Sequence, residues 1–499
     1  MSAKEIKDIL LNLSDNEKKE RLNVLSDLLF YLGECENKEA AVFDNILLGQ
    51  SWITLDSLDY VPSQVIDNKI KPLINKQARF MFGKEPNILF KPLDKKDKES
   101  CEELRQYVDA ILNASKFWSN TLKAFRLATV TKRVMLRLEA NPGQPVRLYY
   151  YDINDFSYML DTNDISKVNK VVLVRQDIET ATKEESNQLW YRYTYYMNDK
   201  KTSCYLKIET FNGNNLEVPI EIKEHDTGLS KIPCWIITNE QSIVNPYGLS
   251  DIKDLKPLQD SYNRRLSDFN DSLRFLMFGQ TAIIDATEDT VNDCNIAPNA
   301  LMALKSIEDT EGNKQAKVQR VESNFTNAEP VKMYLKLLED SMYEKLGIPR
   351  PEQLQSVPSA KSLKYMYSEL VARCEEKWHD WEPVIRSMIR LIVEACSKFK
   401  CYDDWKEEWS NLLYNIVINK NYPIPEDEED KKKLAMEEVQ NNVRSHRSYI
   451  KDYSNDEDYQ EHFKEILEDI NSVSEAEQID SFQKALESEL SNNSTGDGQ

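Results

Sequence analysis

The sequence predicts a mostly helical α+β protein, and the spacing of its apolar residues supports this. Apolar residues recur every three or four positions up to residue 132 and again after residue 247, which is typical of amphipathic helices. Between residues 134 and 238 the period shortens to about two, which is typical of strands. With 499 residues, 40% of them apolar, the chain can form about two to four domains with cores of their own.

Three helical regions are expected before the strands. Residues 1–50 carry two apolar stripes, the second of which ends at Gly33. The next region runs from Ile66 to Met81, and Pro72 inside it predicts that the helix starts or restarts there. The third runs from Glu102 to Lys132.

The middle of the chain is predicted to form an antiparallel β region with one solvated face, over residues 134–238. Tyr191, Tyr193 and Tyr195 alternate with other residues, and so do the apolar residues from Leu216 to Ile222. The segment 212–215, Asn-Gly-Asn-Asn, is a hairpin signal between two such runs.

Helical spacing returns in two stretches that flank short strands. The first carries an apolar stripe from Ile252 to Leu276, and the second begins at Pro330 and stops at Gly347. The short strands are expected at residues 281–284, 300–304 and 316–321.

A proline-containing loop at residues 349–359 leads into the longest helical pattern, residues 360–400. Pro383 lies inside that pattern and predicts a kink, because proline removes one hydrogen bond and clashes with the preceding turn. A lone strand is expected at residues 415–418, acidic helices at 426–470, and a mobile tail at 471–499.

The charge is strongly negative, at −21, with 85 acidic and 64 basic residues. Residues 426–499 hold 21 acidic and eight basic residues, so they carry −13 of this charge. Such a balance argues against a protein that coats DNA, which would neutralise phosphates with Lys and Arg. We expect no secretory signal, no membrane span and reduced thiols, because no long apolar stretch occurs and the eight Cys are scattered.

No catalytic motif or metal-ligand pattern is found. The four His lie outside HExxH or HxH settings, and no phosphate-binding G-x-x-x-x-G-K-[ST] loop occurs. Acidic pairs such as Asp403 with Asp404 are expected by chance among 85 carboxylates, so a metal-dependent nuclease is only an alternative. We expect no metal, no cofactor and no enzymatic activity.

The loop before the longest helix is the one candidate contact with nucleic acid. Its polar and basic side chains could touch a phosphate backbone, although an ordinary connection between helices is favoured on the residues alone. These side chains are Gln353, Gln355, Ser356, Ser359, Lys361 and Lys364.

Four sequence blocks, taken in this order, are informative together. They are IDNKIKPLINKQARFMFGKEP at 66–86, YGLSDIKDLKPLQDSYNRRLSD from 247 and continuing to 275, SAKSLK at 359–364, and NIVINKNYPIP at 415–425. On these blocks the chain resembles the portal proteins of tailed double-stranded DNA bacteriophages, of the long-tailed type, from about Asp59 to Ile470. In the third block many of those proteins have a Gly where this chain has Ala360.

The resemblance implies a ring, usually of twelve copies, built from a wing, stem, clip and crown. It divides the chain into an N-terminal helical segment (1–58), wing (59–246), first stem helix (247–277), clip (278–326), second stem helix (327–346), tunnel loop (347–359), long kinked helix with return to the wing (360–425), crown (426–470) and flexible acidic tail (471–499). Arg350 joins the six loop side chains named above as a candidate facing the DNA.

The implied function is a structural channel at one vertex of the viral head, made in the host cytoplasm, through which double-stranded DNA is packaged and ejected. The implied partners are the terminase, a head-completion or adaptor protein at the clip, and the major capsid or scaffold protein. A metal-dependent nuclease and a ring or scaffold protein without a DNA channel are the alternatives.

Overall fold

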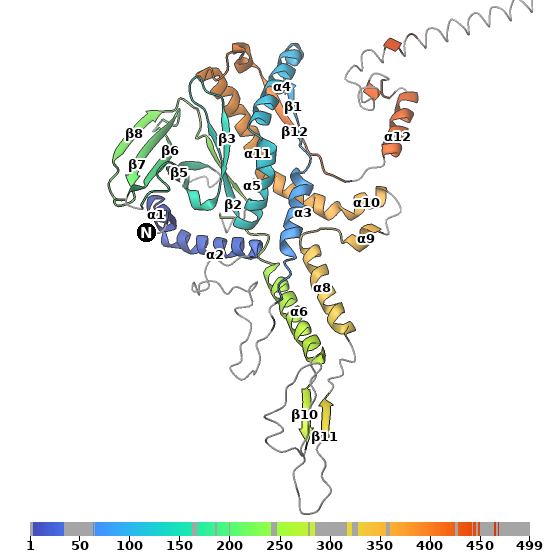
Figure 1. Cartoon of the computed structure of the whole chain (residues 1–499). Coiled ribbons are helices and arrows are strands. Elements are labelled where there is room, and N and C mark those ends of the chain that lie inside the picture. The colour runs from blue at the N-terminus through green and yellow to red at the C-terminus, as the bar shows by residue number, and fades with distance from the viewer. Residues whose placement is uncertain are drawn as a thin grey trace, which may run out of the picture. The chain divides into compact units, whose positions relative to one another are not determined.

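The structure is a computed structural model, shown in Figure 1. It forms two compact units, residues 1–357 with 364–423 and residues 358–363 with 424–499, and each is described by itself. The described residues are 3–33, 63, 65–161, 167–184, 187–198, 200–240, 247–277, 280–284, 317–321, 328–355, 360–424, 428–441, 443–445, 448–449, 464–465 and 468.

Two antiparallel sheets in the larger unit confirm the predicted β region. The first has the order β3-β2-β9, and the second has the order β4-β5-β6-β7-β8. The strands are β2 (Arg133–Glu139), β3 (Arg147–Tyr151), β4 (Phe156–Leu160), β5 (Val168–Gln176), β6 (Leu189–Met197), β7 (Cys204–Asn212), β8 (Glu221–Asp226) and β9 (Cys234–Thr238).

One apolar core joins the two sheets. Met135 of β2 and Cys234 of β9 pack with Leu173 of β5 and Tyr195 of β6. Val174 points to the opposite face of the five-stranded sheet, because side chains alternate along a strand. Helix α1 (Ala3–Leu10) covers that face with side chains such as Ile6, so neither face of these central strands is solvated throughout.

The edge strand β8 differs from its prediction. The apolar alternation from Leu216 to Ile222 was expected to form a strand, but β8 begins only at Glu221 and all six of its residues are exposed. Val218 and Ile220 are each 63% exposed, so their alternation does not mark a buried face. The hairpin signal at 212–215 begins at the last residue of β7 and lies before β8, which pairs antiparallel with β7.

The first helices form largely as predicted. Helix α2 (Asp15–Leu32) starts where the Ser14 side chain accepts a hydrogen bond from the amide of Glu17, and ends at Gly33, whose φ is +72°. Helix α3 (Ile70–Phe82) begins just before Pro72. The third region is two helices, α4 (Lys98–Ala114) and α5 (Phe117–Thr131), because Lys116 between them takes a left-handed conformation.

An aromatic cluster packs these helices against the longest helix, α11 (Ser368–Phe399). The ring of Phe82 at the end of α3 lies 5.0 Å from that of Trp378 and 5.3 Å from that of Trp381. It also lies 5.5 Å from Phe125 of α5. All of these rings are at least nine-tenths buried.

The region expected to form one long helix is divided at Tyr367, between α10 (Ala360–Met366) and α11. The backbone around Pro383 is helical on both sides, so the break does not fall there, and a bend at Pro383 stays a prediction. The strand expected to be lone, β12 (Tyr414–Asn419), instead pairs antiparallel with β1 (Asn87–Pro92). Pro92 and Tyr414, which face each other at one end of this pair, are 322 residues apart in the sequence.

Helices α6 (Lys256–Met277) and α8 (Glu329–Lys345) lie side by side (Figure 1). Between them in the chain comes an antiparallel pair of strands, β10 (Gln280–Ile284) with β11 (Lys317–Val321). The expected strand at residues 300–304 lies outside the described residues. A short helix, α9 (Pro351–Gln355), occupies part of the predicted loop.

The smaller unit contains α12 (Glu428–Gln440), which confirms the first of the expected acidic helices. The tail at 471–499 lies outside the described residues. Among the helices of the described ranges, none is both long and apolar enough to cross a lipid bilayer.

Candidate functional site

A row of four polar side chains on α6 binds the backbone of the segment 63–69. Lys69 donates its amide to the Oε1 atom of Gln259 at 2.9 Å, and Asp67 donates to the Oδ1 atom of Asn263 at 3.2 Å. Val65 donates to the Oγ atom of Ser267 at 2.8 Å, and Ser63 donates to both carboxylate oxygens of Asp271 at 3.0 and 3.1 Å. We call these four side chains, Gln259, Asn263, Ser267 and Asp271, the α6 polar row.

The spacing of the two elements explains this match. Four helical residues advance about 6 Å, and two residues of an extended chain advance about 6.6 Å, so every fourth side chain meets every second amide. The row is buried, with exposed fractions of 0 to 7%. The apolar spacing correctly predicted a helix here, but α6 buries this polar row, and Leu273 of the apolar stripe is 40% exposed.

Helix α8 carries an apolar face that the described residues leave uncovered. Leu338 and Met342 on one side of α8 are buried, whereas Met333 and Leu337, one turn apart, are 66% and 60% exposed. Tyr334 beside them is 43% exposed. Water-facing side chains of this size on one helix face are typical of a surface that contacts another polypeptide.

A buried charge cluster connects Asp251, in the turn just before α6, with α11. The Lys377 ammonium on α11 lies 2.9 Å from the Oδ1 atom of Asp251 and 2.7 Å from the Oδ1 atom of Asn239, just after β9. Arg373, one turn earlier, lies 3.2 Å from the same Asp251 oxygen and 2.7 Å from the Oε1 atom of Glu240. The side chains of Asp251 and Lys377 are 0% and 2% exposed.

The two cations decide the ionisation of Asp251. Burial alone would raise the pKa of its carboxyl group, but Lys377 and Arg373 outweigh burial, so the pKa lies below its usual value. Asp380 lies on the same helix and behaves in the opposite way. Burial raises the pKa of Asp380 to about 6, against the smaller opposing effects of Lys377 and His379.

The predicted loop begins with an ion-paired arginine. One guanidinium nitrogen of Arg350 lies 2.7 Å from Asp340, and another lies 2.9 Å from Glu344, both on α8. The amide of Arg350 also donates to the Oε1 atom of Gln353 at 3.1 Å. Arg350 therefore holds the start of α9 against the end of α8.

The turn before Arg350 requires glycine. Gly347 has a φ of +63°, and a Cβ atom there would lie 3.2 Å from the carbonyl carbon of Glu369. This close approach brings the end of α8 next to the first turn of α11.

The remaining predicted loop residues are only partly described. Gln353 is exposed on α9, and Lys364 is exposed on α10. The backbones of Gln355 and Lys361 lie in α9 and α10, but their side chains, together with Ser356 and Ser359, lie outside the described residues. The structure thus brings Arg350 and Gln353 together and leaves a joint DNA-facing site untested.

Within the described ranges, no group of three or more His, Cys, Asp or Glu side chains is placed to hold a metal ion. His379 is exposed on α11.

Comparison with protein families decides the identity. A family model described as phage portal protein, SPP1 Gp6-like, matches residues 11–476. The chain belongs to this portal family. The match starts before residue 59 and ends after residue 470, so the portal family covers both ends more fully than the four sequence blocks predicted. A comparison with curated proteins finds no match.

Sequence reasoning missed the two polar features that organise this portal protein. Both could have been noticed as charged or amide residues within apolar helical patterns: the α6 polar row recurs at intervals of four, and Arg373 and Lys377 stand four apart among apolar neighbours of α11. Nothing in the sequence identifies the partners of these side chains, which come from segments far away in the chain.

Proposed function

We propose that this portal protein assembles into a closed ring, of about twelve copies by family resemblance, whose channel passes double-stranded DNA at one vertex of the viral head. Membership of the portal family supports the role. The observation that carries the ring is the uncovered apolar face of α8, formed by Met333, Tyr334 and Leu337. In a cyclic ring each copy covers one face of its neighbour by heterologous contacts that close on themselves.

The role needs no chemistry by this chain. Packaging would be driven by a separate terminase, and the strand pair β10–β11 lies in the region 278–326 that would meet terminase and head-completion proteins. The acidic character of the chain supports a channel wall that holds DNA weakly, since each missing phosphate contact removes a counterion-release contribution to binding. The mature location would be the virion, with capsid or scaffold protein around the ring.

Negative-stain electron microscopy with native mass measurement tests the ring. We expect annular particles with a central hole and a mass near a dozen 58.2 kDa subunits. A chain that stays monomeric across salt and protein concentration, and cuts DNA when Mg²⁺ or Mn²⁺ is added, would instead support the nuclease alternative.

The DNA-facing loop has its own test. We expect Lys361→Ala and Lys364→Ala to alter DNA packaging or retention in heads while rings still form. Lys91→Ala, an exposed cation on β1, serves as the control and should leave both unchanged. Loss of rings in either loop variant would contradict the assignment of residues 347–359 to the tunnel.

A further inference from the structure

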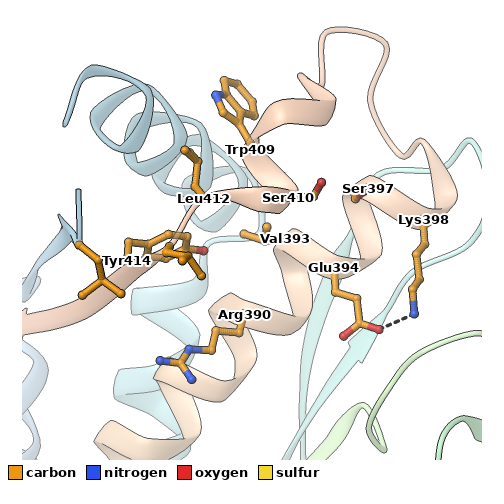
Figure 2. Close-up of a pocket in the computed structure, with 11 residues that line it drawn as sticks. Arg390, Val393, Glu394, Ser397, Lys398, Trp409, Ser410, Leu412 and Tyr414 are labelled. Atoms are coloured by element: carbon orange, nitrogen blue, oxygen red, sulfur yellow. Dashed lines mark hydrogen bonds and ion pairs between the residues drawn. The ribbon is translucent and has the colours of Figure 1, made fainter. Parts of the chain in front are cut away.

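A groove of about 490 Å³ opens between α11, the one-turn helix η5 (Glu407–Asn411) and the end of the β1–β12 pair (Figure 2). Its volume falls within the range of about 300 to 1,000 Å³ that is usual for ligand sites. The groove lies within the larger unit and uses none of the residues assigned above to the stem, clip or loop.

The apolar part of the groove has an exposed rim. Leu93 and Leu413 are joined by a backbone hydrogen bond of 2.9 Å between the Leu93 amide and the Leu413 carbonyl, and they are 65% and 66% exposed. Val393 and Trp409 line the groove and are 7% and 3% exposed. Two leucines held side by side in water can be covered by an apolar side chain from outside.

The carboxylate of the groove, Glu394, already has hydrogen-bond partners. The Oε1 atom of Glu394 accepts hydrogen bonds from the Ser230 amide at 2.8 Å and from Lys398 at 2.7 Å, and its Oε2 atom accepts one from the Ser230 hydroxyl at 2.5 Å. Lys398 also donates to the Gly228 carbonyl at 2.8 Å. Figure 2 shows Glu394 turned toward Lys398, away from Arg390.

Arg390 is therefore the unpaired charge of the groove. Within the described part of the chain its guanidinium forms no ion pair or hydrogen bond, and the Ser397 hydroxyl in the lining has no partner there either. Both groups donate hydrogen bonds, and a guanidinium matches a carboxylate with two parallel bonds. A row of phosphates would call for several cations, so a single arginine beside leucines fits a carboxylate better than a nucleic-acid backbone.

We propose that this groove docks a short segment of another protein that carries Asp or Glu next to Leu or Phe. The apolar side chain covers Leu93 and Leu413, and the adjacent carboxylate accepts hydrogen bonds from Arg390. The lining of the groove shares no residue with the uncovered face of α8.

The experiment selects binders from a random decapeptide display library on the full-length chain, and measures labelled winners by fluorescence polarisation. We expect enrichment of Asp or Glu beside Leu or Phe. Arg390→Glu should weaken the winners about tenfold or more, because charge-assisted hydrogen bonds are lost, and Leu413→Asp should weaken them too. The matched control is Arg386→Glu, an exposed cation one turn earlier on α11 and outside the lining, which should leave affinity within about twofold.

Three results would overturn the proposal. They are a failure to enrich any peptide, enrichment of peptides without acidic residues, and equal loss of binding in Arg390→Glu and Arg386→Glu. Native mass measurement on Leu413→Asp adds a fourth: an altered subunit number would show that a second copy of this chain covers the groove.

Discussion

Lys377 shows how much depends on single side chains in this protein. Its ammonium contacts oxygens of Asn239 and Asp251, which lie more than 120 residues earlier in the chain. A buried ammonium is stable only when such partners replace its hydration. The contact therefore joins the end of β9, the approach to α6 and the long helix α11 at one point.

Removing this cation should destabilise the larger unit. We expect Lys377→Met to lower the free energy of unfolding by about 3 kcal/mol, because Asp251 would remain buried with only Arg373 as a cation. Urea denaturation followed by tryptophan fluorescence measures the change. Arg386→Met, an exposed cation on α11, should change it by under about 0.5 kcal/mol. The double variant Asp251→Asn, Lys377→Met should recover part of the loss, and a double variant less stable than the single one would contradict the pairing.

Asp380 should make stability depend on pH in a defined direction. Its folded pKa of about 6 lies above the usual value of 3.8, so the folded state holds a proton that the unfolded state loses between these values. Stability should therefore fall as pH rises from 4 to 6. We expect Asp380→Asn to raise the melting temperature at pH 7 but not at pH 4, as followed by circular dichroism. An equal gain at both pH values would refute this cause.

At the scale of elements, the period of apolar residues predicted where helices and strands occur, but not which faces they bury. On α6, Leu258, Leu266, Phe269 and Leu273 are half-buried or exposed and Tyr262 is buried, whereas Gln259 and Asn263 are fully buried. The reason is that the segment 63–69 brings backbone amides, and these need acceptors rather than methyl groups. Likewise β12 could not be paired with β1 from the sequence, because 322 residues separate them at Pro92 and Tyr414.

The α6 polar row can be tested one side chain at a time. Gln259→Leu removes the acceptor of the Lys69 amide and leaves a buried donor unpaired, which costs about 1 to 3 kcal/mol. We expect faster hydrogen exchange at Lys69 and Asp67, measured by mass spectrometry. Arg265→Ala, on the exposed side of α6, is the control, and equal exchange in both variants would show that the row does not hold the segment.

At the scale of the whole molecule, the resemblance predicted the family, and the family match confirms it. The position of the candidate loop could be predicted from the order of the helices along the chain. Its proposed role depends on contacts with a neighbouring subunit or with DNA. The sequence could not predict which loop side chains face DNA, because such contacts involve a second molecule. Within its own chain, Arg350 pairs with Asp340 and Glu344.

Ring assembly should depend on the apolar face of α8. We expect Leu337→Asp to leave the isolated chain folded, since this side chain is 60% exposed, and to shift the native mass from rings to monomers. Lys332→Asp, an exposed neighbour on the same helix, changes charge without removing apolar surface and should still form rings. Rings of normal mass in Leu337→Asp would place the subunit contact elsewhere.

The α6 polar row also has a mechanical consequence. A force that pulls the segment 63–69 along the axis of α6 loads the hydrogen bonds of all four side chains at once, because these bonds lie across the direction of the force. A force that pulls the segment away from the helix loads these hydrogen bonds one after another, so they break in sequence. The attachment should therefore resist shear far better than peeling, and single-molecule force spectroscopy with handles in the two directions would give two distinct rupture forces. If α6 lines the route of packaged DNA, the force along that route falls in the strong direction.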